Sequence, residues 1–105
     1  MVVIEFFYSP LCTYCTLARS VVEDLSAELG DEVSLKIEEY NVFSDIGMKR
    51  KEVYNITEVP TLIINGRIRI TGAPDRDRLR QIVEKESSST AEQQPQNRPT
   101  SEPDR

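Results

Sequence analysis

The two cysteines of this 105-residue chain, Cys12 and Cys15, stand two residues apart where an apolar run meets a helical pattern. Thiols at positions i and i+3 in a first helical turn are close enough to form a disulfide. They are also the minimal set for thiol–disulfide exchange. Unpaired N–H groups and the macrodipole at a helix N-terminus favour a thiolate and lower its pKa. We therefore predict that Cys12 is the nucleophile and Cys15 the resolving thiol.

The composition narrows the classes of partner. The net charge is −5 and the chain has no histidine, so the cysteine pair lacks the usual companions of a zinc site, and we expect no bound metal. An acidic balance does not suit binding to nucleic acid or to an anionic membrane. No apolar run could span a bilayer, and the first ten residues lack the features of a signal peptide. We expect a monomer in the cytoplasm. In that reducing compartment, such a cysteine pair is catalytic or metal-binding rather than structural.

The first half of the chain reads as strand, helix, strand. Residues 2–8 are nearly all apolar, which is typical of a central strand buried on both faces. A buried helical stripe follows, ending at Gly30, and its expected members are Leu17, Ala18, Val21, Val22, Leu25 and Leu29. Residues 33–38 alternate between apolar and polar, as a strand with one wet face does. A strand, a helix and a strand in this order predict a right-handed parallel unit.

The second half reads as helix, hairpin, helix. Ser44 and Asp45 favour a helix start, with a weaker apolar face formed by Ile46, Met48 and Val53. Residues 61–64 form a short apolar strand, and Asn65-Gly66 is a strong signal for a hairpin into a half-exposed edge strand at 68–71. Asp75 is placed to cap the last helix.

The chain changes composition after Glu86. Residues 87–105 contain no aliphatic side chain larger than that of alanine. Such a segment cannot bury enough apolar surface to offset its ordering entropy. We predict one domain over residues 1–86 and a disordered polar tail over residues 87–105.

The cysteine pair after the first strand, together with Val59-Pro60-Thr61 before the third, resembles the thioredoxin superfamily over residues 1–86. The best overall resemblance is to the small, glutaredoxin-sized thioredoxins of archaea. It implies an α/β fold of order βαβαββα, with a four-stranded mixed sheet and helices on both faces. It also implies reduction of protein disulfides through a redox-active Cys12–Cys15 disulfide. No other cofactor is bound, and a separate reductase or a small thiol supplies the electrons.

The resemblance assigns further residues to the site. It implies that Pro60 is cis and faces the disulfide, which leaves the backbone of Val59 free to pair with a substrate strand. Tyr14, between the cysteines, is an exposed candidate for substrate contact. The remaining assignments are structural ones, to Pro10, Thr13 and Gly72.

Two alternatives follow from departures within the superfamily. Tyr14 stands where glutaredoxins have tyrosine, which favours a glutaredoxin that uses glutathione or another small thiol. However, Ser9 and Thr71 replace the lysine and the glycine of the glutathione site, and only Asp75 of that set is present. The other alternative is a dimeric carrier of an iron–sulfur cluster, with Cys12 ligands from two chains.

A carboxylate near the cysteines could take part in proton transfer. Thioredoxins carry a buried aspartate where this chain has Phe6, and the neighbouring Glu5 is the acid within the first strand. A shift of one residue in a strand moves a side chain to the other face of the sheet. The register therefore argues against proton transfer by Glu5.

Overall fold

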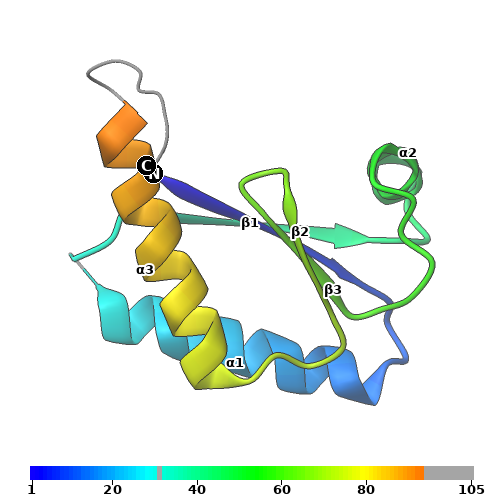
Figure 1. Cartoon of the computed structure of the whole chain (residues 1–105). Helices are drawn as coiled ribbons and strands as arrows, with labels where there is room; N and C mark the ends of the chain where they lie inside the picture. Colours follow the sequence, from blue (N-terminus) through cyan, green and yellow to red (C-terminus); the bar gives the residue numbers. More distant parts are fainter. Residues whose placement is uncertain (31, 94–105) are drawn as a thin grey trace.

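The computed structural model of the chain describes residues 1–30 and 32–93. The elements, in chain order, are β1 (Val2–Tyr8), α1 (Thr13–Leu29), β2 (Leu35–Asn41), α2 (Asp45–Val53), β3 (Thr61–Ile64), β4 (Ile68–Thr71) and α3 (Arg76–Gln93). The four strands form one sheet in the order β2-β1-β3-β4. β1 is parallel to β2 and antiparallel to β3, and β3 is antiparallel to β4. This arrangement confirms the predicted mixed α/β sheet (Figure 1).

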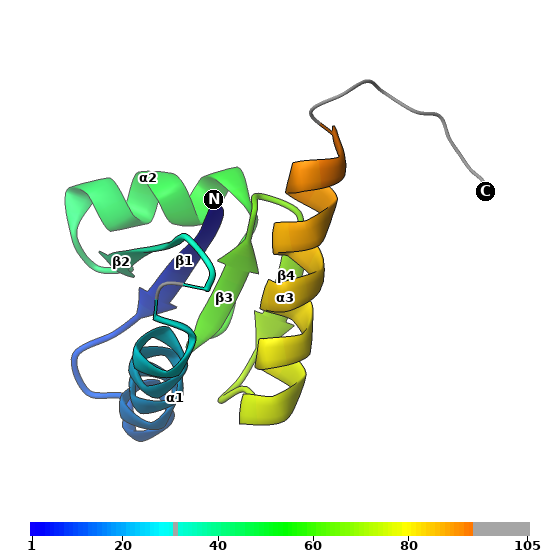
Figure 2. The same ribbon diagram turned by 90° about the vertical axis from the view of Figure 1, so that its left-hand side faces the viewer.

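Helices cover both faces of the sheet. α1 and α3 lie on one face and α2 lies on the other, as Figures 1 and 2 show from two directions. β1 is buried on both sides because its side chains alternate between two apolar clusters. Ile4 and Phe6 pack with α1 and α3 in the larger cluster, whereas Phe7 packs with Ile63 in the smaller one. No helix in the described part of the chain is long and apolar enough to cross a membrane.

The buried stripe of α1 differs in part from the prediction. Its buried residues are Cys15, Ala18, Val22, Leu25 and Leu29. Leu17 is half exposed, so its place in the stripe was wrong, and Val21 is only partly buried. The reason is the helical period: Leu17 is two residues from Cys15, roughly 200° around a helix of 3.6 residues per turn. The resolving cysteine is thus part of the core face of α1.

The predicted apolar face of α2 is also wrong. Ile46, Met48 and Val53 are all exposed, and Gly47 is the buried residue of this helix. The start of α2 packs so closely on β2 that a Cβ at Gly47 would lie 1.7 Å from the carbonyl oxygen of Asn41. Ser44 caps the helix by accepting a hydrogen bond from the Gly47 amide, as predicted. Side-chain burial of apolar residues therefore does little to hold α2 on the sheet.

The predicted turns are confirmed. Asn65 and Gly66 both have positive φ, as a two-residue hairpin loop requires. Gly30 takes the positive φ that suits the residue after α1. Asp75 caps α3 by accepting a hydrogen bond from the Arg78 amide at 3.0 Å.

The end of α3 lies beyond the predicted domain boundary. The helix continues to Gln93, so it includes the first residues of the segment expected to be a disordered tail. No proline or glycine interrupts the chain between Glu86 and Gln93, so the helical hydrogen bonds can continue there. The rest of the expected tail, residues 94–105, lies outside the described residues.

Candidate active site

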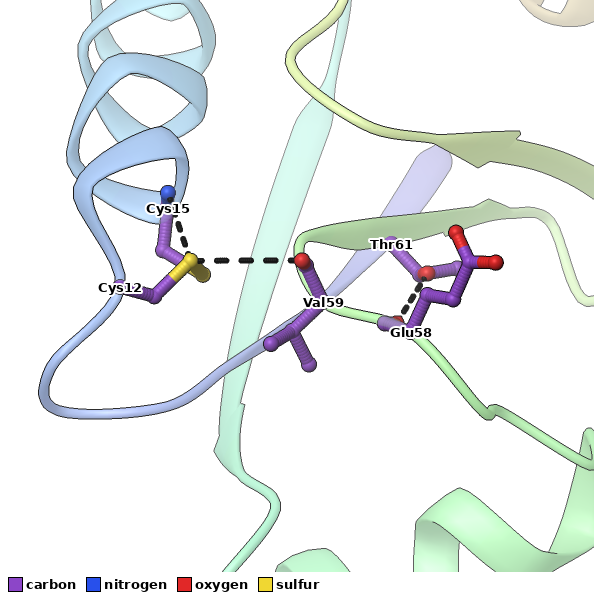
Figure 3. The surroundings of a disulfide bond; sticks show 5 residues. All are labelled: Cys12, Cys15, Glu58, Val59 and Thr61. Atoms are coloured by element: carbon purple, nitrogen blue, oxygen red, sulfur yellow. Dashed lines mark hydrogen bonds between the residues drawn. A yellow bond between two sulfur atoms is a disulfide. The ribbon is translucent and has the colours of Figure 1, made fainter.

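The cysteine pair lies at the N-terminus of α1, directly after the loop that leaves β1. Cys12 is the N-cap residue of the helix, and Cys15 belongs to its first turn. The two residues form a disulfide, with their Cα atoms 5.2 Å apart. Pro10 and Thr13 flank Cys12, Pro10 in the loop and Thr13 at the first helical position. The structure thus brings the predicted reactive pair to the place that the sequence indicated (Figure 3).

The two sulfur atoms differ in environment. Cys15 is 2% exposed and belongs to the larger apolar cluster, whereas Cys12 is only partly buried. The Cys15 backbone amide donates a hydrogen bond to Cys12 Sγ at 3.1 Å. Because an N–H donor favours a negative charge on its acceptor, this contact stabilises a thiolate at Cys12 rather than at Cys15.

The loop before β3, residues 54–60, places a backbone carbonyl beside the disulfide, and we call it the Val59 loop. The Val59–Pro60 peptide bond is cis, as the resemblance implied. The Val59 carbonyl oxygen lies 4.0 Å from Cys12 Sγ, and Figure 3 shows it directed at that sulfur atom. A reduced Cys12 thiol can donate to this oxygen. Val59 and Cys12 come from segments far apart in the sequence.

Two further hydrogen bonds hold this loop. The Gly72 amide donates to the Pro60 carbonyl oxygen at 2.8 Å, with Gly72 at a φ of 90°. The Thr61 hydroxyl donates to the Glu58 carbonyl oxygen at 2.7 Å. The Glu58 side chain is exposed and points away from the disulfide in Figure 3. Gly72 is therefore in contact with the backbone of Pro60.

A hollow adjoins the Val59 loop on the side of the sheet that α2 covers. It is lined by Ser9, Val42, Phe43, Lys51, Ile56, Thr57, Glu58 and Val59. The Phe43 side chain is 72% exposed, so it lies outside the core. Leu11 and Tyr14 are also strongly exposed next to the cysteines. The disulfide is thus bordered by exposed apolar side chains.

Sequence reasoning missed the contribution of Phe43 and Lys51 to this hollow. A usable signal existed for Phe43, because it follows the carboxyl end of β2 as the cysteine loop follows that of β1. These strands are parallel, so the two loops leave the same edge of the sheet. No comparable signal existed for Lys51, which belongs to α2 and reaches the hollow only through the packing of that helix.

Glu5 lies outside the site. It is 3% exposed, and it accepts hydrogen bonds from Arg50 Nε at 2.5 Å and from the Tyr54 hydroxyl at 2.6 Å. Arg50 belongs to α2 and Tyr54 ends it, so Glu5 faces the sheet side opposite to α1. Phe6, at the position of the thioredoxin aspartate, lies instead in the cluster of Cys15. The register argument against proton transfer by Glu5 agrees with this placement.

One residue of the expected glutathione site has a structural role here. Asp75, the residue shared with the glutathione site of glutaredoxins, uses its carboxylate to cap α3. Within a single chain, the side chains of residues 1–30 and 32–88 include no group of three or more His, Cys, Asp or Glu that could hold a metal ion.

Comparison with known proteins identifies the family. A family model described as a thioredoxin domain matches residues 2–84. The chain is 37% identical over 82 residues to a thioredoxin of Methanocaldococcus jannaschii, covering 78% of this chain and 92% of that protein. It is 36% identical over 84 residues to a probable thioredoxin of Methanothermobacter thermautotrophicus, covering 79% of this chain and 93% of that protein.

A solved structure shares the fold. A mutant thioredoxin from Halobacterium salinarum superposes with a TM-score of 0.68 at 26% identity, covering 82% of this chain and 74% of the other. Sequence, fold and a cysteine pair at disulfide distance therefore agree with one another. The chain belongs to the thioredoxin superfamily and is a thiol–disulfide oxidoreductase.

Proposed function

We propose that this protein reduces disulfide bonds in other proteins, with Cys12 as nucleophile and Cys15 as resolving thiol. The observation that carries the assignment is the asymmetry of the pair. Cys12 is the more accessible sulfur, it caps α1 and it accepts the Cys15 amide, whereas Cys15 is buried in the core. An attacking sulfur must reach its substrate, while a resolving sulfur needs to reach only Cys12.

The reaction has two exchanges. The Cys12 thiolate attacks one sulfur of the substrate disulfide, forming a mixed disulfide and releasing the other substrate sulfur as a thiolate. Cys15, after losing its proton, attacks Cys12 Sγ and breaks the mixed disulfide. The substrate gains two electrons and two protons, and the Cys12–Cys15 pair is oxidised to the disulfide.

The Val59 loop supports a preference for protein substrates. Proline has no N–H group, so Pro60 leaves this part of the loop without one backbone donor. The Val59 carbonyl beside Cys12 is then available to an extended substrate segment that pairs with the loop. The exposed apolar side chains of Tyr14 and Phe43 favour a protein surface rather than a small polar thiol.

The protein must be reduced again after each turnover. We propose that it acts as a monomer without another bound cofactor, and that a separate reductase or a small thiol supplies the electrons. The glutaredoxin alternative has less support, because Asp75 is engaged as a helix cap and the relatives named above are thioredoxins.

Redox titration against dithiothreitol and glutathione buffers, with adducts followed by mass spectrometry, tests this proposal. We expect a reduction potential nearer to about −270 mV than to about −200 mV, and no lasting glutathione adduct on Cys12. Cys15→Ser should accumulate a mixed disulfide with a protein substrate, whereas Cys12→Ser, the matched control, should not. A stable glutathione adduct at a higher potential would overturn the proposal in favour of a glutaredoxin.

A further inference from the structure

A polar cluster around one buried carboxylate lies on the α2 face of the sheet, and the reaction described above does not use it. The cluster consists of Glu5 on β1, Arg50 on α2 and Tyr54 at the end of α2. Besides the two bonds to Glu5, Arg50 Nη2 donates to the Tyr54 hydroxyl at 3.1 Å. All three side chains are therefore bonded to one another.

The cluster supplies an attachment that α2 otherwise lacks. Because Ile46, Met48 and Val53 are exposed, their burial cannot hold the helix on the sheet. Close packing at Gly47 fixes the first turn of α2. The bonds from Glu5 fix the other end, which is the end that leads into the Val59 loop. A carboxylate that is 3% exposed makes a strong anchor, because losing its partners would leave a buried polar group unsatisfied.

Tyr54 is held on two sides. Its hydroxyl donates to Glu5 on β1, and its carbonyl oxygen accepts a hydrogen bond from Arg69 on β4. Its ring meets the ring of Phe7 edge-on, with centroids 6.1 Å apart. The residue at which α2 ends is therefore tied to the central strand and to an edge strand.

The constraint extends along the chain to the site. The Ile56 amide donates to the Lys51 carbonyl oxygen at 3.0 Å, and Ile56 is 3% exposed. Tyr54 and Val59 both pack against the smaller apolar cluster, to which Ile56 belongs. The loop is thus anchored at Tyr54, Ile56 and Val59. Lys51, Ile56 and Val59 also line the hollow that adjoins the Val59 loop.

We propose that Glu5, Arg50 and Tyr54 are positioning residues for protein substrates. They fix the Val59 loop from the opposite face of the sheet, so that the Val59 carbonyl stays beside Cys12. This inference rests on the proposed pairing of a substrate segment with the Val59 loop. Small disulfides, which have no peptide backbone to pair with the loop, should not depend on the cluster.

The test compares two disulfide substrates in two buried-carboxylate variants. Glu5→Gln removes the charge that binds Arg50, and Glu86→Gln is the matched control. Glu86 is 4% exposed and binds Arg67 at 2.5 Å and Asn65 at 3.1 Å, but these contacts join α3 to the β3–β4 hairpin. Each variant is assayed with insulin and with 5,5′-dithiobis(2-nitrobenzoate), using dithiothreitol as reductant, and its thermal midpoint is measured.

We expect both variants to lower the thermal midpoint. Only Glu5→Gln should raise the KM for insulin, by about three- to tenfold, with kcat nearly unchanged, as the loss of uniform binding requires. Reduction of the small disulfide should change by less than about twofold in either variant. If Glu5→Gln fails to fold, Tyr54→Phe, which keeps the ring and removes one bond to Glu5, decides the question by the same KM.

Three outcomes would contradict the proposals. An insulin KM for Glu5→Gln, or for Tyr54→Phe in its place, that matches the wild type despite a lower thermal midpoint would show that the cluster only stabilises the fold. An equal rise of KM in Glu86→Gln would show a general effect of lost stability. Failure of the wild type to reduce insulin would instead overturn the proposed function, which distinguishes the two failures.

Discussion

The Cys15 amide donates a hydrogen bond to Cys12 Sγ at 3.1 Å, so the backbone of one cysteine stabilises charge on the side chain of the other. This contact exists because Cys12 occupies the N-cap position of α1, where a side chain can accept from an otherwise unpaired amide. The same helix turns the Cys15 side chain into the core. One helix start thus gives the two thiols different chemical properties.

The pKa of the reduced Cys12 thiol should lie below the value of about 8.5 for a free cysteine. The rate of alkylation by iodoacetamide, followed against pH by mass spectrometry, reports the thiolate fraction. We expect the rate to fall only when the pH drops below this lowered pKa. Cys15→Ser keeps the donating amide and should keep the lowered pKa. An alkylation midpoint at or above that of a free cysteine would contradict the prediction.

Pro60→Ala should slow the reduction of protein disulfides. Alanine adds an N–H group next to the Val59 carbonyl and loosens the loop that is held at Pro60 by the Gly72 amide. We expect kcat/KM for insulin to fall about tenfold, or about 1.4 kcal/mol in transition-state binding. Steady-state kinetics measure this change, and Pro74→Ala serves as a control, because Pro74 is a buried proline before α3. Unchanged kinetics in Pro60→Ala would remove this role of Pro60.

Glu5→Gln should leave the pH dependence of small-disulfide reduction unchanged. Glu5 binds Arg50 and Tyr54 on the face opposite to Cys15, so it has no route to the proton of that thiol. The pH profile of 5,5′-dithiobis(2-nitrobenzoate) reduction in wild type and variant checks this. A profile displaced along the pH axis in Glu5→Gln would show that the carboxylate takes part in proton transfer after all.

Alkaline pH should destabilise the fold partly through Tyr54. Burial, and then the hydrogen bond to Glu5, raise the pKa of the Tyr54 phenol above 10. The native state therefore keeps this proton when the unfolded chain has lost it, so the stabilisation is complete below about pH 10 and is lost as the pH rises through the native pKa. Urea unfolding at a series of pH values should show that the free energy of unfolding falls less steeply with rising pH in Tyr54→Phe than in the wild type.

Tyr40 provides the comparison for that experiment. Burial is also the main cause that raises the pKa of Tyr40, so some alkaline loss should remain in Tyr54→Phe. If the free energy of unfolding fell equally steeply with pH in the wild type and in Tyr54→Phe above about pH 10, this would contradict a raised pKa at Tyr54.

Arg19→Ala should lower the free energy of unfolding by about 1 kcal/mol. The guanidinium of Arg19 lies over the rings of Phe6 and Tyr8, at 5.3 and 4.8 Å from their centroids, and pairs with Glu39 at 3.1 Å. Urea unfolding measures the loss. Arg19→Lys should recover little of it, because lysine lacks the planar group that stacks and pairs at the same time. Full recovery in Arg19→Lys would mean that the charge alone matters.

Local patterns in the sequence were enough to predict much of the fold. The apolar run of residues 2–8, the Asn65-Gly66 turn and the caps at Ser44 and Asp75 each carry their signal within a few residues. The cysteine pair carries its own chemistry in the same way. The predictions of the strand, the turn and the caps were confirmed because neighbours in the sequence determine these features. The separate roles of Cys12 and Cys15 stay predictions.

The wrong predictions concern residues whose burial is determined by contacts with residues far away in the sequence. Apolar residues on α2 were expected to face the sheet, but a short helix can also be held by polar bonds that reach across the fold. The partners Glu5 and Arg50 lie 45 residues apart, and no local pattern indicates that they meet. The position of Leu17 was misjudged because the start of α1 at Thr13, with Cys15 on its buried side, sets which residues face inward.

The burial of Cys15 links the redox couple to the hydrophobic core. Cys15 belongs to the same apolar cluster as Phe6, Val22 and Leu62, and its side chain is buried in the core of the disulfide form. A core substitution that destabilises the folded dithiol and the folded disulfide by different amounts must change the free-energy difference between these two forms. For this two-electron couple, a difference of about 1.4 kcal/mol corresponds to about 30 mV. The electron affinity of the protein is therefore a property of its apolar packing as well as of its two cysteines.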